Sequence, residues 1–137
     1  MRKVGFFLIC MLVAGCAPRP LIRPLKPQEI ALARYQEVIT AAVAGSLMYE
    51  GDCLLFRDDA TQSYLLPVWP YGSSFNGTAV LFHHPGKADQ RILVSEEFVM
   101  EGQALDYSRL PQAYYAPFRT QCPGYQPFFV SSTRPAN

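Results

Sequence analysis

The chain has 137 residues, of which half are hydrophobic and 17% are charged. This composition is too apolar for an intrinsically disordered chain, and the length fits one ordinary domain. The formal net charge of +1 provides no global basic field, so the sequence argues against a nucleic-acid-binding protein.

The first fifteen residues have the three-part layout of a secretory signal peptide. Arg2 and Lys3 supply a short basic region, and an apolar run follows from Val4 to Val13. Such a run is roughly half of the ~20 residues that a helix needs to cross a bilayer. We therefore expect residues 1–15 to be a signal peptide and not a permanent transmembrane anchor.

The segment Val13-Ala14-Gly15-Cys16 at the end of this run resembles the lipobox of bacterial lipoproteins. The resemblance implies that Cys16 receives a diacylglyceryl group, that cleavage occurs before Cys16, and that the new amine is acylated, for example by palmitate. Three acyl chains would hold the protein on the membrane without a spanning helix. Ala17 stands where Asp usually marks retention in the inner membrane. The resemblance thus implies a lipoprotein of the cell envelope that is anchored in the outer membrane. No residue pattern encodes which side it faces, and we expect the periplasmic side.

Residues 16–27 are the predicted tether. Four prolines within Ala17–Pro27 exclude a helix and favour an extended spacer, which would hold the domain roughly 30 Å from the bilayer. Arg19, Arg23 and Lys26 make this stretch basic, so it is either a soluble linker or a segment attracted to anionic headgroups. Residues 28–137 form the predicted single domain, and from Tyr35 onward the chain carries six basic and ten acidic residues.

The sequence of the domain predicts a mainly β fold. Pro27-Gln28-Glu29 favours one short helix to about Glu37, and a strand is predicted from Val38 to Tyr49, with a helix ending at Gly45 as the alternative. Beyond Gly51, short apolar runs recur at spacings near ten residues: 53–56, 64–69, 78–83, 92–94, 98–100 and 128–130. This pattern predicts a small antiparallel barrel or sandwich.

Two local signals refine this prediction. Asn76-Gly77 predicts a hairpin turn of type I′, in which both central residues have positive φ. Pro67 lies inside an apolar run, and its missing amide hydrogen predicts an edge strand or a bulge there.

Cys53 and Cys122 are the two cysteines that would remain free after processing and lipidation. In an oxidising compartment we predict a disulfide between them, worth roughly 4 kcal/mol in the chain-entropy model. A reactive thiol is the alternative.

The sequence offers no constellation typical of an enzyme. His83 and His84 are the only histidines, and neighbours on a strand point to opposite faces, so we expect no metal site. We find no nucleophile elbow, phosphate loop or zinc-protease motif, and we interpret Glu96-Glu97 as a solvated turn. We therefore expect a protein without a cofactor and without catalytic activity.

The segment from Tyr107 to Tyr125 is long for a connection, and long loops are often functional. Its tyrosines offer a flat apolar face with a polar tip, which suits contacts with a peptide or a sugar. The alternative is that these rings cover one open end of the barrel. The candidate ligand-binding residues are Trp69, Tyr107, Tyr114, Tyr115 and Phe118.

The stretches Gly45–Leu54 and Leu66–Pro70 look similar to small envelope β-domains of unassigned function, a resemblance that implies no activity. Two functions remain open. The first is a membrane-anchored lipoprotein that docks a protein or another envelope component. The alternative is a lipoprotein that binds a small peptide or sugar through its aromatic loop.

Overall fold

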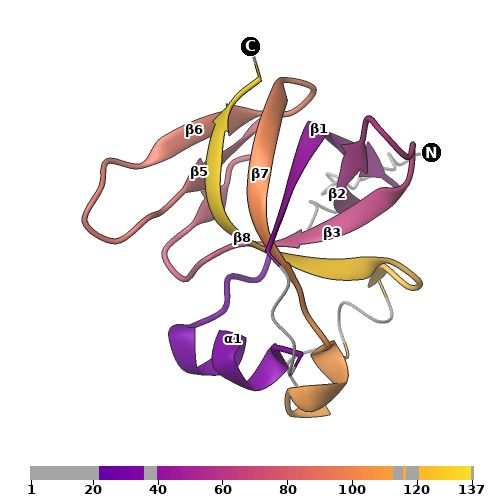
Figure 1. Cartoon of the computed structure of the whole chain (residues 1–137), viewed down its shortest axis with the longest axis vertical. Coiled ribbons are helices and arrows are strands. Elements are labelled where there is room, and N and C mark those ends of the chain that lie inside the picture. The colour runs from indigo at the N-terminus through magenta and orange to yellow at the C-terminus, as the bar shows by residue number, and fades with distance from the viewer. Residues whose placement is uncertain (1–21, 36–39, 113–115, 117–120, 137) are drawn as a thin grey trace, which may run out of the picture.

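The computed structural model describes residues 22–35, 40–112, 116 and 121–136 (Figure 1). The described elements begin with helix α1 (Pro27–Ala33), and the 3-10 turn η1 (Tyr107–Arg109) follows the seventh strand. The strands are β1 (Ala41–Glu50), β2 (Cys53–Asp58), β3 (Tyr64–Val68), β4 (Ser74–Phe75), β5 (Ala79–Phe82), β6 (Gln90–Leu93), β7 (Glu97–Ala104) and β8 (Gln126–Pro135).

Five of these strands form a closed barrel in the order β1-β2-β3-β8-β7 (Figure 1). The neighbours are antiparallel except β3 and β8, which run parallel from Leu65↔Gln126 to Val68↔Phe129. One parallel pair is unavoidable, because an odd number of strands in a closed ring cannot alternate direction all the way round. The arrangement is a five-stranded Greek-key barrel, the class to which OB folds belong. The predicted mainly β fold with a small barrel is confirmed.

The chain builds a second, three-stranded sheet in the order β4-β5-β6 between β3 and β7. The predicted hairpin is present here, but its turn is not of type I′. Gly77 has a φ of +100°, whereas Asn76 is not among the described residues with positive φ. The Asn76 side chain instead accepts hydrogen bonds from the amides of Thr78 (2.9 Å) and Ala79 (2.8 Å). The asparagine thus caps the turn from its first position.

β1 decides between the two alternatives for residues 41–45, which form a strand and not a helix. Gly45 lies in the middle of β1, where an added Cβ would lie 1.9 Å from the carbonyl oxygen of Arg57 on β2. The glycine therefore allows close approach of two barrel strands, and it does not end a helix. Val38, Ile39 and Glu37 lie outside the described residues.

Helix α1 is shorter than predicted. It ends at Ala33, because Arg34 adopts an extended conformation and forms a β-bridge with Leu105. Pro67 also differs from its prediction, since β3 has neighbours on both sides. β3 is therefore not an edge strand. Its pairing with β2 covers only Tyr64 and Leu65, so Pro67 is paired with β8 but has no partner on β2.

The N-terminal part of the described chain belongs to the folded domain. Ile22 packs against the main core, and the side chain of Leu25 is buried with 2% exposure. The amide of Leu25 donates to the Trp69 carbonyl (3.1 Å), and the Leu25 carbonyl accepts from the Tyr71 amide (3.0 Å). Residues 22–26 of the predicted tether are therefore structured, and the domain begins before residue 28.

Candidate functional site

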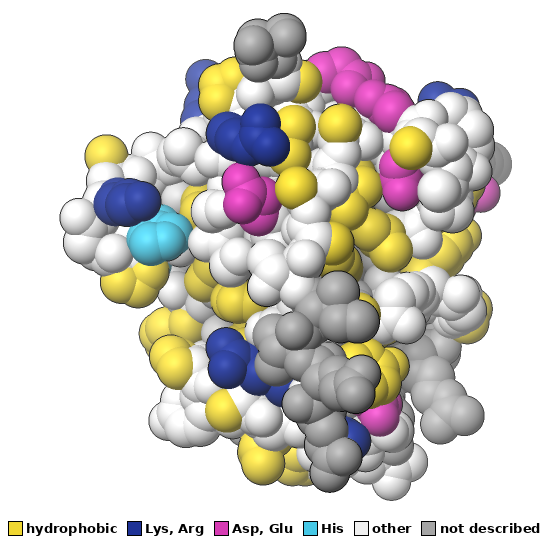
Figure 2. Space-filling view, viewed as in Figure 1, with side chains coloured by type: hydrophobic (Ala, Val, Ile, Leu, Met, Phe, Trp, Pro, Cys, Tyr) yellow, Lys and Arg dark blue, Asp and Glu magenta, His cyan; other side chains and the backbone are white. Residues whose placement is uncertain are grey.

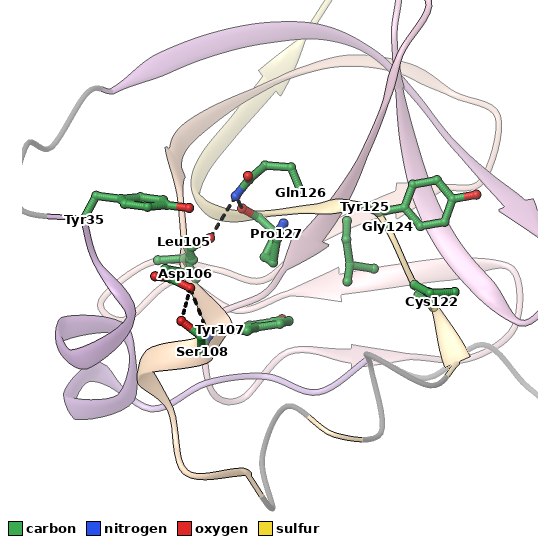
Figure 3. A pocket seen from close by; sticks show the side chains of 12 residues that line it. Tyr35, Leu105, Asp106, Tyr107, Ser108, Cys122, Gly124, Tyr125, Gln126 and Pro127 are labelled. Carbon is green, nitrogen blue, oxygen red and sulfur yellow. Dashed lines mark hydrogen bonds between the residues drawn. The ribbon is translucent and has the colours of Figure 1, made fainter.

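A cavity of about 490 Å³ opens between the segment that follows β7 and the segment that precedes β8 (Figure 3). This volume lies within the roughly 300–1,000 Å³ typical of small-ligand sites. Tyr35 and Tyr125 lie on opposite sides of the pocket in Figure 3. The polar and aromatic lining residues are Tyr35, Asp106, Tyr107, Ser108, Tyr125 and Gln126.

A small core beside the pocket fixes one of its walls. The predicted disulfide between Cys53 and Cys122 is present, with the two Cα atoms 5.6 Å apart. It joins the start of β2 to the segment before β8, and both cysteines pack with Leu55 and Leu66. The rings of Tyr64, Tyr107 and Tyr125 pack against this cluster. The covalent link therefore holds one side of the long loop at the barrel wall.

Asp106 is the ionised group of the pocket. Its Oδ1 accepts hydrogen bonds from the Ser108 amide (3.0 Å) and hydroxyl (2.6 Å), and its Oδ2 lies 3.7 Å from Nε of Arg109. The Ser108 hydrogen bonds, with a smaller effect of the Arg109 charge, lower the pKa of Asp106 below its usual value. A general acid needs the opposite shift. Asp106 is therefore suited to accept hydrogen bonds and not to donate a proton.

Gln126 and Tyr107 are held in fixed positions. Nε2 of Gln126 donates to the carbonyls of Leu105 (2.8 Å) and Pro127 (2.9 Å), which fixes the amide plane at the pocket wall. Burial raises the pKa of the Tyr107 phenol, against the smaller opposing effect of the Arg23 charge. Tyr107 therefore stays neutral at physiological pH and presents an apolar ring.

The structure brings together only part of the predicted ligand set. Tyr107 lines the pocket, whereas Trp69 is in the main core with 1% exposure and packs edge-on against Phe82, with ring centroids 6.1 Å apart. Trp69 is thus a core residue and does not line this pocket. Tyr114, Tyr115 and Phe118, like Cys16, lie outside the described residues.

Tyr35 and Gln126 also line the pocket, although they are not among the residues predicted to bind a ligand. Tyr35 follows α1 and is separated from the loop along the chain by most of the barrel, so its spacing carries no signal. It reaches the pocket because the Arg34↔Leu105 bridge and the hydrogen bond from the Asp106 amide to the Ala33 carbonyl (2.8 Å) bring these segments together.

The two histidines bind different partners. His83 Nδ1 lies 2.9 Å from Oδ1 of Asp89, and His84 Nδ1 lies 3.2 Å from the Pro85 carbonyl oxygen. Within the described part of the chain, no group of three or more His, Cys, Asp or Glu side chains is placed to hold a metal ion. The same residues include no helix long and apolar enough to span a membrane.

Comparison of this chain with protein-family models, with curated proteins and with solved structures finds no match. We call the cavity lined by Tyr35, Tyr107 and Tyr125 the tyrosine pocket. Its function must therefore be inferred from the chemistry of its lining residues. That chemistry is a set of aromatic walls beside one carboxylate and one oriented amide.

Proposed function

We propose that this chain is a lipid-anchored protein of the bacterial envelope, held at the outer membrane through Cys16, whose barrel binds a small ligand in the tyrosine pocket. The lipobox-like segment Val13–Cys16 supports the anchor. The observation that carries ligand binding is the cavity of about 490 Å³ beside Tyr107. It lies at the loop whose length and tyrosines predicted a binding function.

The pocket lining favours a sugar or a short extended peptide. Both ligand types combine apolar faces with many hydrogen-bond donors. The Tyr35 and Tyr107 rings supply flat apolar surfaces, and Asp106 supplies a hydrogen-bond acceptor that is ionised at neutral pH. We propose no reaction for this site, because the lowered pKa of Asp106 suits recognition and not proton transfer.

Docking of an envelope protein is the second candidate function. The observation that favours it is that Leu81 and Leu93, on the second sheet, are both exposed. Their cross-strand partners are Arg91 and Ala79, so the two leucines lie on one face of the β5–β6 pair. A photo-crosslinking side chain at position 81, compared in intact cells with one at position 35, would show which surface contacts a protein.

Two experiments test the main proposal. Cys16→Ser should leave an uncleaved precursor that takes up no fatty-acid probe, and normal labelling of this variant would overturn the anchor. For the pocket, the purified full-length protein is titrated with oligosaccharides and with short peptides. Tyr35→Ala should weaken binding of the active class by about fivefold or more, whereas Tyr71→Ala, an exposed tyrosine outside this pocket, should not. Equal binding by both variants would refute the site.

A further inference from the structure

The folded domain starts close to the predicted lipidation site. Ile22 already packs against the main core, and Leu25 is bridged to Pro70. Six peptide units separate Cys16 from Ile22, so their Cα atoms lie no more than about 22 Å apart even when the chain is fully extended. With the lipid on Cys16, the surface next to residues 22–26 therefore lies near the headgroups of the bilayer.

The surface concerned is the α1 face, which we define as Lys26, Leu32, Arg34, Tyr71 and the groove beside them. Leu32 and Tyr71 are 57% and 60% exposed, and Lys26 Nζ lies 5.5 Å from the centroid of the Tyr71 ring. The groove has a volume of about 450 Å³, and most of its lining is apolar: Leu25, Ile30, Pro70, Tyr71, Pro85 and Phe129.

The charges of the described domain are unevenly placed. Figure 2 shows Lys and Arg side chains on both halves of the molecule, with some of them beside hydrophobic side chains at the α1 end. The segment 22–35, which includes α1, holds three basic residues and one acidic residue, whereas residues 40–104 hold three basic and eight acidic residues. On α1 itself, Glu29 is engaged with the Lys26 amide through its Oε1 (2.8 Å). Four of the acidic residues lie at the end of β2 and the start of β7: Asp58, Asp59, Glu96 and Glu97.

We propose that the α1 face rests on the anionic headgroups of the membrane that carries the anchor. Tyrosine is enriched at membrane interfaces, and a lysine stem can lie along apolar surface while its ammonium group reaches the headgroups. The basic α1 face is attracted to an anionic surface, and the net negative charge of residues 40–104 is repelled by it, so charge orients the domain. This inference rests on the proposed lipidation of Cys16.

The test uses the lipidated mature protein, residues 16–137, in vesicles of phosphatidylcholine with one quarter phosphatidylglycerol, whose headgroups carry a nitroxide quencher. A fluorophore is attached at Gln28→Cys on α1 or at Ala136→Cys, which follows the end of β8 at the opposite end of the barrel. We expect stronger quenching at position 28. The double variant Lys26→Gln/Tyr71→Ala should reduce the ratio of quenching at position 28 to quenching at position 136 by roughly fivefold, because it removes one basic charge from the surface near the headgroups. Tyr49→Ala should leave this ratio unchanged.

Each result decides the proposal. Stronger quenching at position 28 that falls in pure phosphatidylcholine or at high salt supports headgroup contact. Equal quenching at both positions, or stronger quenching at position 136, overturns the orientation while the anchor stands. A protein that does not float with the vesicles at all overturns the lipid anchor and this inference with it. If position 28 is shielded from the quencher by a co-purified protein, that protein and not the lipid covers the α1 face, and the proposal is overturned.

Discussion

The amide of Leu25 donates a hydrogen bond to the carbonyl of Trp69, 3.1 Å away, and thereby attaches a proline-rich segment to the end of β3. The Leu25 side chain packs with Ile30, Val68 and Leu105 in a core between α1 and the barrel. Leu25, which lies in the predicted tether of residues 16–27, is in this way part of the hydrophobic core.

We predict that Leu25→Ala lowers the free energy of unfolding by about 2–5 kcal/mol, because it leaves a cavity in this core. Urea unfolding followed by circular dichroism measures the change. Leu32→Ala, at an exposed position of α1, is the matched control and should change stability by less than about 0.5 kcal/mol. Equal effects of the two variants would show that Leu25 is not part of the core.

The disulfide should be structural. Cys53 and Cys122 are 69 positions apart, so losing their bond should cost roughly 4 kcal/mol in the chain-entropy model. Cys53→Ser, Cys122→Ser and the double variant should all melt at similar reduced temperatures, since the two residues act as a unit. Mass spectrometry of non-reduced peptides checks the bond directly. Recovery of both thiols free in envelope-derived protein would contradict this prediction.

Gly45 and Gly102 should tolerate no side chain. A Cβ on Gly102, where the register between β7 and β8 shifts, would lie 1.7 Å from the Phe129 carbonyl oxygen, and one on Gly45 would be similarly close to the Arg57 carbonyl. We expect either Gly→Ala change to destabilise the barrel by about 1–3 kcal/mol or more, because backbone atoms must move. Thermal melting provides the measurement. Ala44→Ser, at an exposed position beside Gly45, should be nearly neutral.

Glu97 should make the stability depend on pH. Hydrogen bonding to the Asp59 carboxyl raises the pKa of Glu97, helped by a small loss of hydration and by the Asp59 charge and opposed by the Arg57 charge. The folded state thus binds this proton more tightly than the unfolded state, so the pair adds stability at acid pH that is lost as pH rises through the folded-state pKa.

Glu97→Gln should therefore raise the melting temperature at neutral pH, and its advantage over the natural protein should shrink as pH falls through the range in which carboxyl groups titrate. Melting curves across that range measure the effect, with Glu50→Gln at the exposed end of β1 as the control. A gain that is the same at every pH would contradict the assignment.

Residue 17 should govern membrane sorting in a host with two membranes. We expect Ala17→Asp to move the protein toward the inner-membrane fraction, because the resemblance to bacterial lipoproteins implies that Asp after the lipidated cysteine marks retention there. Fractionation of the two membranes measures the shift, and Ala17→Ser is the matched control. An unchanged distribution would show that residue 17 does not set the address.

Local patterns in the sequence are sufficient to predict the mainly β class, most strand positions and the disulfide. Short apolar runs that recur at spacings near ten residues and are separated by turn residues predict strands. The pairing of Cys53 with Cys122 follows from counting, since they are the two cysteines expected to remain free. The lipobox-like motif is likewise local, and it stays a prediction.

Contacts between distant segments decided the rest. Whether residues 41–45 form a helix or a strand depends on how closely β2 approaches Gly45, and the place of Trp69 depends on the core that Phe82 shares with it. The tyrosine pocket needs Tyr35 and Tyr107, which only the closed barrel brings together. The sequence by itself determined the local elements, because spacing and residue type act over a few positions. Only the tertiary structure decided that the pocket forms, that Leu25 is buried and that the α1 face is exposed, because burial depends on which parts of the chain, distant in sequence, come into contact.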